Sequence, residues 1–369
     1  MRRGLAVLLG LLGLLTTHAS QGATPPAPFQ QRYGDWTVAC DNVLACSAQG
    51  YRVLAPDEDE GQSDSQVQAG LWLSRDAGPQ GAVHLQLHLG SRDGQDAPEG
   101  SRVDVRIGGR DFRQLPLDAD LPPAIAQVLV RAMVEAPRMR LSGRDSEATV
   151  SLQGLKAALL KMDDTQGRAG TVTAWVAKGQ ATAARVPLAP PLPVLVPATI
   201  PTRLPADADA VLTRQLVHHP AVIQDCYLLQ EAPREADRLP ETAIHQIRRK
   251  EYLVLMECAR AAYQTSYRLW RVKQGAKALD VAPEVLPDLQ EPALDLMNAE
   301  FNAGKLSTWH KGRGLGDCGG NREWVWTASG FALRLANEAP DCNGIYGGGP
   351  GLTLWQAEVQ PVPKPAIRP

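Results

Sequence analysis

Six cysteines behind an export signal constrain the fold of this 369-residue chain more than any other feature. Two arginines stand near the start, and the apolar run that follows over residues 5–15 is too short to span a bilayer. Small residues come next, so we predict a secretory signal peptide over residues 1–23, cleaved after Ala19 or Ala23. Export would place the mature chain in an oxidising compartment, where an even number of cysteines indicates disulfides.

The spacing of the cysteines favours three nearest-neighbour bridges, although six cysteines allow fifteen connectivities. The proposed pairs are Cys40 with Cys46, Cys226 with Cys258, and Cys318 with Cys342. In the simple chain-entropy model, the second bridge contributes about 3 kcal/mol to stability. This pairing leaves no thiol over for catalysis. We expect the protein in the periplasm, with the extracellular medium as the second choice.

The length of the chain predicts about two domains, and a proline-rich stretch marks the boundary between them. Six prolines lie within residues 186–204, so neither a helix nor a central strand can run through this stretch. We therefore predict a first domain over residues 28–185, an extended linker over 186–204, and a second domain over 205–361. Residues 362–369 are predicted to form a flexible tail.

Charge and hydropathy exclude some classes of partner. The formal net charge is −2, which gives no electrostatic reason to expect nucleic acid binding. After the signal, no apolar stretch reaches the length of a membrane span. No cofactor motif is present, and the sequence leaves the oligomeric state open.

Alternation of polar and apolar residues predicts mostly β structure with a few helices, that is, an α+β protein with antiparallel sheets. The first domain is expected to be β-sandwich-like with helices packed at one side, and the second to be a twisted sheet with an amino-terminal helix and two disulfides. The predicted strands include residues 35–40, 70–74, 82–89, 102–107, 171–176, 253–258, 263–272, 323–327 and 331–335. The predicted helices are residues 122–134, 152–162 and 207–218.

Several polar groups resemble metal sites, but a simpler interpretation is favoured for each. His84 and His88 share the polar face of one predicted strand and have no third ligand in view. His218 and His219 are adjacent, which makes a poor site by itself. The acidic run over residues 57–64 lacks the glycine and glutamate positions of a calcium loop, so a solvated loop is favoured. We predict no metal site.

Asp163 and Asp164 form a pair of neighbouring carboxylates at the end of a predicted helix. Arg168 follows four residues after Asp164, so a capping and ion-pairing role is favoured over catalysis.

The densest cluster of functional candidates is the glycine-rich loop over residues 311–320. Lys311, Arg313 and the backbone amides of the flanking glycines are suited to holding an anion, such as a phosphate or a carboxylate. The alternative, which we favour, is a tight turn tied by a disulfide. Trp324 and Trp326 fall on one face of the next strand, where they form either a stacking platform or part of the core, and the core is favoured.

Three blocks of sequence resemble one bacterial family. They are KGRGLGDCG with the later WVW and FALRL, GDWTVACDNVLACSAQGY near the mature start, and SLQGLKAALLKMDDTQGRAG in mid-chain. Together they resemble the domain of unknown function 1176 family. The first domain is also weakly similar to the invasion-associated locus B proteins, which share a W-x-V-x-C start and a helix of the SLxGxxAAL type. The resemblance implies a secreted, periplasmic protein and supplies no activity or catalytic residue.

The leading hypothesis is a non-enzymatic binding module for an envelope protein or an anionic envelope glycan, with the loop over residues 311–320 as its site. The alternative is a hydrolase, or a hydrolase inhibitor, acting on cell-envelope material. Against an enzyme, the sequence has no G-x-S-x-G elbow and no histidine cluster with zinc spacing. An acid pair such as Asp163 with Glu323 stays open, because sequence does not reveal distance in space.

Overall fold

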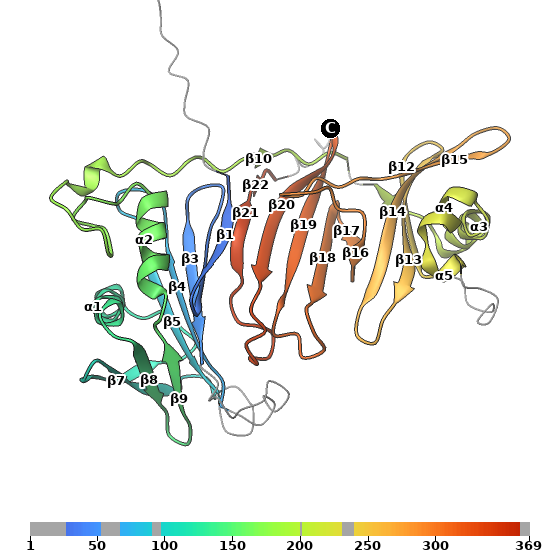
Figure 1. Cartoon of the computed structure of the whole chain (residues 1–369). Coiled ribbons are helices and arrows are strands. Elements are labelled where there is room, and N and C mark those ends of the chain that lie inside the picture. Colours follow the sequence, from blue (N-terminus) through green and yellow to red (C-terminus); the bar gives the residue numbers. More distant parts are fainter. Residues whose placement is uncertain (1–26, 53–66, 91–96, 200, 231–239, 362–369) are drawn as a thin grey trace, which may run out of the picture.

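The computed structural model describes residues 27–52, 67–90, 97–199, 201–230 and 240–361. The predicted signal peptide, the acidic run over residues 57–64 and the predicted tail lie outside these residues. The described chain is mostly β, with antiparallel sheets, a few helices and three disulfides, so the predicted fold class is confirmed. Figure 1 shows that the last sheet in the sequence lies between the first sheet and the sheet that carries α3, α4 and α5.

The first sheet is a five-stranded antiparallel meander in which each strand pairs with the next. Its second and third strands are joined at Cys40 and Cys46, which are register partners and form the first disulfide. The alternation that predicted the fifth strand is confirmed, because Val83, Leu85 and Leu87 are buried. The strands are β1 (Phe29–Tyr33), β2 (Trp36–Cys40), β3 (Cys46–Tyr51), β4 (Ala69–Arg75) and β5 (Val83–Leu89).

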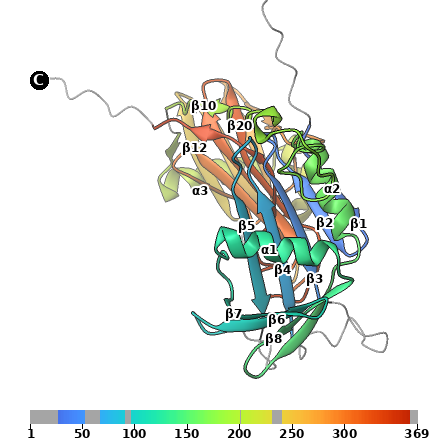
Figure 2. The ribbon, with the colours of Figure 1, turned by 90° about the vertical axis from the view of Figure 1, so that its left-hand side faces the viewer.

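A four-stranded sheet and two helices complete the core of the first half. The sheet has the order β7-β6-β8-β9 and one charged, solvent-facing side. Figure 2 shows α1 lying across the strands and α2 packed beside it. The elements are β6 (Arg102–Ile107), β7 (Arg110–Pro116), α1 (Pro123–Val134), β8 (Arg138–Ser142), β9 (Glu147–Ser151) and α2 (Leu155–Thr165).

The helix α2 begins three residues later than predicted because Gly154 has a left-handed conformation, with φ 95°. A Cβ at this position would lie 1.8 Å from the carbonyl oxygen of Tyr33, so the close approach of β1 also requires glycine.

The predicted strand over residues 171–176 is wrong. Asp163 on α2 is fully buried and accepts hydrogen bonds from the backbone N–H groups of Trp175 (2.9 Å) and Val176 (2.8 Å). A β ladder would need those donors, so the segment instead folds as turns around the carboxylate. Asp163 therefore anchors a loop, rather than capping its own helix. The turns end in a short 3₁₀ helix over Ala183–Arg185.

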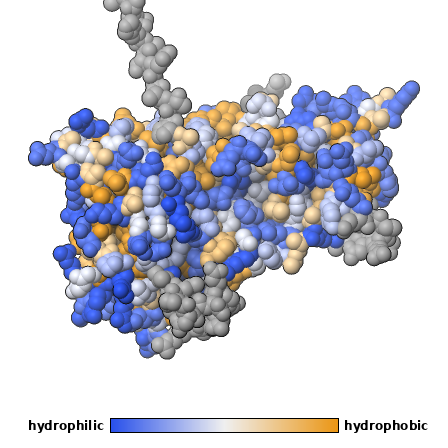
Figure 3. All heavy atoms as spheres, in the orientation of Figure 1, coloured by the Kyte–Doolittle hydropathy of each residue, from blue (hydrophilic) through white to orange (hydrophobic). Residues whose placement is uncertain are grey.

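The proline-rich stretch is extended and follows the second half of the chain. Within its described residues, the regular structure is limited to two-residue strands: β10 (Val194–Leu195), parallel to β22 (Glu358–Val359), and β11 (Thr202–Arg203), antiparallel to β12 (Thr242–Arg248). Leu188 is 80% exposed. Figure 3 shows apolar side chains gathered along the upper edge, where β10 runs in Figure 1.

The third sheet carries three helices on one face. Cys226, at the end of α4, is bonded to Cys258 in β13, which ties the helices to the sheet. The predicted helix over residues 207–218 ends earlier, at Leu216, and Pro220 opens a new helix instead of only ending the first. The elements are α3 (Ala206–Leu216), α4 (Pro220–Asp225), α5 (Tyr227–Gln230), β13 (Glu251–Arg260), β14 (Thr265–Gln274), β15 (Leu279–Pro283) and β16 (Leu296–Met297).

The last sheet packs its apolar face against β13 and β14, so that Leu306, Trp324 and Trp326 form one core with Leu253 and Leu255. The predicted hairpin is confirmed, and its strands are longer than predicted. Its elements are β17 (Glu300–Asn302), β18 (Lys305–Lys311), β19 (Gly319–Thr327), β20 (Gly330–Ala339) and β21 (Leu352–Gln356). The third disulfide joins Cys318, just before β19, to Cys342, just after β20.

The edge strand β21 and the loop before it contact the first sheet. Gln356 accepts a hydrogen bond from Asn42 at its carbonyl oxygen (2.9 Å), and its backbone N–H donates to the Asn42 side chain (2.8 Å). Asp341 accepts a hydrogen bond from Thr37 (2.8 Å) and forms an ion pair with Arg32. The two halves are therefore docked through polar contacts. No helix among the described residues is long and apolar enough to cross a membrane.

Candidate functional site

The glycine-rich loop that was a candidate anion site is held together by an internal ion pair. Arg313 donates from Nε (2.8 Å) and Nη2 (2.5 Å) to the carboxylate of Asp317, which is fully buried. The backbone N–H of Gly344 donates to the same carboxylate at 2.6 Å. Burial alone would raise the pKa of Asp317, but the hydrogen bonds from Arg313 and Gly344 outweigh it and lower the pKa. The Arg313 guanidinium is thus already engaged within the loop.

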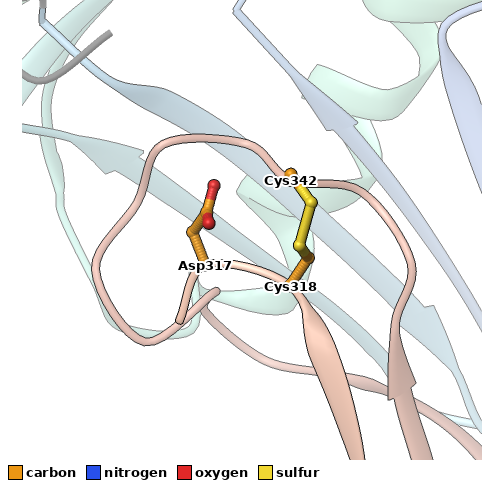
Figure 4. Close-up of side chains that lie close together, drawn as sticks. All are labelled: Asp317, Cys318 and Cys342. Atoms are coloured by element: carbon orange, nitrogen blue, oxygen red, sulfur yellow. A yellow bond between two sulfur atoms is a disulfide. The ribbon is translucent and has the colours of Figure 1, made fainter. Parts of the chain in front are cut away.

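The disulfide between Cys318 and Cys342 lies next to this carboxylate, as Figure 4 shows. Asp317 and the two sulfur atoms lie within 4.8 Å of one another, a spacing that would suit a metal ion. A metal binds thiolates, however, and both sulfurs are used in the bond between them. The cluster therefore holds the loop in place, in agreement with the favoured interpretation of a disulfide-tied turn.

The two tryptophans that were candidates for a stacking platform are buried. Trp324 is 1% exposed and donates from its indole nitrogen to the carbonyl oxygen of Pro287 at 2.6 Å. Trp326 is 6% exposed, and its ring packs edge-to-face on Phe331 with a centroid separation of 5.1 Å. Both belong to the core, the interpretation favoured from the sequence, and neither offers a face to a ligand.

Lys311 instead lines a cleft of about 400 Å³ at the end of the last sheet. Two exposed aromatic side chains line the same cleft: Trp309, which is 47% exposed, and Tyr346, which is 75% exposed. The Lys311 ammonium lies 5.3 Å from the centre of the Trp309 ring, within the range of a cation–π interaction. The backbone N–H of Lys311 donates to the Gln264 side chain at 2.8 Å, which fixes the end of β18.

Part of the cleft surface is a cross-strand row in which glycine stands between two polar side chains. His310 on β18 pairs with Gly320 on β19, which pairs with Glu338 on β20. A Cβ on Gly320 would lie 2.6 Å from the Glu338 carboxylate and 2.9 Å from the His310 ring. Only a glycine lets these two side chains lie this close over the strand. The Glu338 carboxylate is held by Arg322 at 2.6 Å.

Another part of the wall is the segment of residues 346–351, which the first half of the chain holds in place. Gly349 has φ 70°, and a Cβ there would lie 2.2 Å from the Trp72 ring. Gln49 on β3 donates a hydrogen bond to the carbonyl oxygen of Pro350. The cleft thus depends on residues far apart in the sequence. The run of glycines at residues 347–349 behind Tyr346 was the one sequence signal for this wall, and the sequence prediction did not use it.

The other sequence candidates lie elsewhere. The solvated interpretation of the histidine pair holds for His84, which is exposed beside Asp120 at 2.8 Å. It is wrong for His88, which is 4% exposed and whose Nδ1 lies 2.8 Å from Asp118. His219 precedes α4 directly.

The structure does not bring Asp163 and Glu323 together as an acid pair. Asp163 is buried against the backbone of the first half, whereas Glu323 lies between Lys305 and Arg334 on the last sheet.

Comparisons with known proteins agree with the sequence blocks. The family model described as "Protein of unknown function (DUF1176)" matches residues 30–358. The chain is also 28% identical over 345 residues to the "Uncharacterized protein YpfG" of Escherichia coli (strain K12), which covers 89% of this chain and 93% of that protein. No solved structure matches the chain. The expected similarity of the first domain to the invasion-associated locus B proteins is not supported by these comparisons.

Proposed function

The chain belongs to the DUF1176 family, and on that premise we propose that it is a non-enzymatic binding module that holds a cell-envelope glycan in the cleft lined by Trp309, Lys311 and Tyr346. A periplasmic location is part of the proposal and is supported by the three disulfides, which persist in oxidising compartments.

The exposure of two large aromatic rings in one cleft carries this proposal. Trp309 and Tyr346 leave 47% and 75% of their surface exposed to water. Large aromatic side chains gain free energy when that surface is buried against a partner. The C–H groups on the face of a sugar ring stack on aromatic rings, and sugar hydroxyls need polar partners close by. The cleft supplies those partners in Asn321, Asn337 and Glu338.

Lys311 supports a preference for an anionic glycan. The charged side chains that line the cleft are Lys311, Glu338 and, when protonated, His310. Glu338 is paired with Arg322, so the Lys311 ammonium is the lining charge that an incoming carboxylate or phosphate would meet. Arg313 supports the site indirectly, because its ion pair with Asp317 fixes the loop that follows Lys311.

A hydrolase acting on envelope material is the second candidate, and the pairing of His310 with Glu338 across Gly320 is the observation that favours it. An imidazole and a carboxylate held close together are side chains that general acid–base catalysis uses. The test is whether a bound glycan is recovered intact. Cleavage that His310→Ala abolishes would establish the hydrolase, whereas unchanged glycan after prolonged incubation supports the binding module.

The experiment that tests the binding proposal is an array of bacterial surface glycans probed with the purified protein and its variants. We expect Trp309→Ala and Tyr346→Ala each to weaken binding about tenfold, because each removes a stacking surface. Lys311→Gln should weaken only the anionic glycans and should reduce the salt dependence of their binding. The matched control is Tyr227→Ala, which removes an exposed ring that does not line the cleft. Equal binding by all four variants would refute the proposed site.

A further inference from the structure

A second cleft lies between the proline-rich stretch and the last sheet, and we propose that it binds a small monocarboxylate with an apolar body. Its volume is about 410 Å³. Pro197 and Ala198 line one side, the turn at Ala303 and Gly304 lines another, and Val359 from β22 closes it. This inference concerns a different site from the glycan cleft and does not rest on the proposed function.

Backbone hydrogen bonds fix the walls of this cleft. The N–H of Ala198 donates to the carbonyl oxygen of Trp326 at 3.0 Å. The N–H of Trp326 in turn donates to the carbonyl oxygen of Gly304 at 2.8 Å. The N–H of Ala357 donates to the carbonyl oxygen of Arg334 at 2.8 Å. Four segments that are distant in sequence are therefore held in register around one space, so the cleft is a built feature of the fold.

The charges in the cleft are unbalanced. Among the residues that line it, the charged side chains are Lys305, Arg334 and Glu323. The Lys305 ammonium lies 3.1 Å from one carboxylate oxygen of Glu323, and Nη1 of Arg334 lies 2.7 Å from the other. Two cations share one carboxylate, which leaves one net positive charge. A single anionic group on a ligand would balance it.

A β-bulge directs Arg334 into this cluster. The register between β19 and β20 shifts between Glu323 and Trp324, whose partners are Leu335 and Leu333. Arg334 is the extra residue of the bulge, so its side chain is aimed at Glu323 instead of following the strict alternation of β20. A regular strand would have left Lys305 as the single partner of that carboxylate.

Apart from Gln360, the remaining residues of the lining are apolar or small, and they decide what kind of ligand body fits beside the charged cluster. Pro197 and Val359 supply hydrocarbon surface beside the charged cluster. A ligand that puts a carboxylate on Lys305 and Arg334 would lay an apolar chain or ring against these side chains. A polyol or a dianion fits less well, because it would place hydroxyls or a second charge against hydrocarbon.

Isothermal titration of the full-length protein with hexanoate, and with hexanamide as the uncharged analogue, tests this inference. We expect hexanoate to bind and hexanamide to bind at least about tenfold more weakly, since only the carboxylate makes charge-assisted hydrogen bonds. Lys305→Gln and Arg334→Gln should each weaken hexanoate. Glu323→Gln should tighten it, because both cations lose the internal carboxylate that competes with the ligand.

Two controls keep the test specific to this cleft. Glu147→Gln makes the same change in net charge at an exposed ion pair with Arg140, remote in sequence on β9, and should leave hexanoate affinity unchanged. Lys311→Gln, in the glycan cleft, should also leave it unchanged. Equal binding of the acid and the amide, or a tightening by Glu147→Gln as large as that by Glu323→Gln, would overturn the assignment. Weaker binding after Glu323→Gln would overturn it as well.

Discussion

The ion pair between Arg313 and Asp317 allows a sharp test of whether the glycine-rich loop is held from within. Arg313→Gln removes the guanidinium and leaves a fully buried carboxylate with the backbone N–H of Gly344 as a remaining donor. Removing one partner of a buried ion pair costs about 3–5 kcal/mol because the other charge stays uncompensated. Since the Arg313 side chain is itself 37% exposed, we expect a loss near the lower end of that range, about 3 kcal/mol.

The reverse substitution should cost less. Asp317→Asn removes the buried charge, still offers an oxygen to Gly344, and leaves Arg313 able to reach water. We expect a loss of about 1 kcal/mol, the net value of an ordinary hydrogen bond. The double variant should be close in stability to Asp317→Asn alone, because the two residues act as one unit.

The pH dependence follows from the same geometry. In the native protein the pKa of Asp317 is lowered, so its stabilisation is complete above the unfolded value of about 4 and is lost as the pH falls through the lower folded value. In Arg313→Gln, burial without the cation raises that pKa instead. The variant then takes up a proton that the native protein does not, and its deficit shrinks by up to about 1.4 kcal/mol per pH unit as the pH falls.

Urea denaturation followed by tryptophan fluorescence at pH 7 and pH 4.5, with the disulfides intact, measures these differences. Arg140→Gln is the matched control, because Arg140 is 52% exposed in its ion pair with Glu147 and its loss should cost no more than about 1 kcal/mol. An Arg313→Gln deficit equal to that of Arg140→Gln, or one that is independent of pH, would refute the structural role of the pair.

Three further substitutions follow from the packing. Gly320→Ala places a methyl group 2.6 Å from the Glu338 carboxylate, so glycan binding should be lost in the array while the melting temperature falls by only a few degrees. Arg168→Met should lower the free energy of unfolding, measured in urea, by about 3 kcal/mol. The reason is that Arg168 is fully buried and donates to the carbonyl oxygen of Gly78 at 2.6 Å. A loss below about 1 kcal/mol would contradict this. Replacing both Cys226 and Cys258 by alanine should cost about 3–4 kcal/mol, given their separation of 32 residues, and an unchanged denaturation midpoint would count against it.

Local patterns predicted the elements whose partners are close in sequence. Alternation located β5, β6 and the hairpin of β19 and β20, and helical spacing located α1 and α2, because each of these buries one continuous face. The same reasoning failed at residues 171–176, where the alternation is equally clear. There the buried carboxylate of Asp163 takes the backbone donors of residues 175–177, a contact that periodicity does not encode.

The candidate site was harder to predict, because exposure decides it. Trp324 and Trp309 are both tryptophans on neighbouring strands of the same sheet, yet one is 1% exposed and the other 47%. The difference comes from what packs over each strand, which sequence spacing alone does not show. Arg313 attracted attention as a cation in a glycine-rich loop, although Asp317 stands four residues later as a ready partner. The charge of Arg313 therefore stabilises the loop through Asp317.

Dependence on both halves of the chain distinguishes the glycan cleft from a surface groove. Tyr346 lies on a loop that the Cys318–Cys342 disulfide ties at its start, and Trp72 of the first sheet packs against Gly349 three residues further on. Gln49 fixes the next residue through its carbonyl oxygen. A ligand that stacks on Tyr346 therefore favours the docked arrangement of the two halves, and anything that loosens the contact at Trp72 should weaken the ligand by the same free energy. This linkage gives the first sheet a role in binding, although none of its residues lines the cleft.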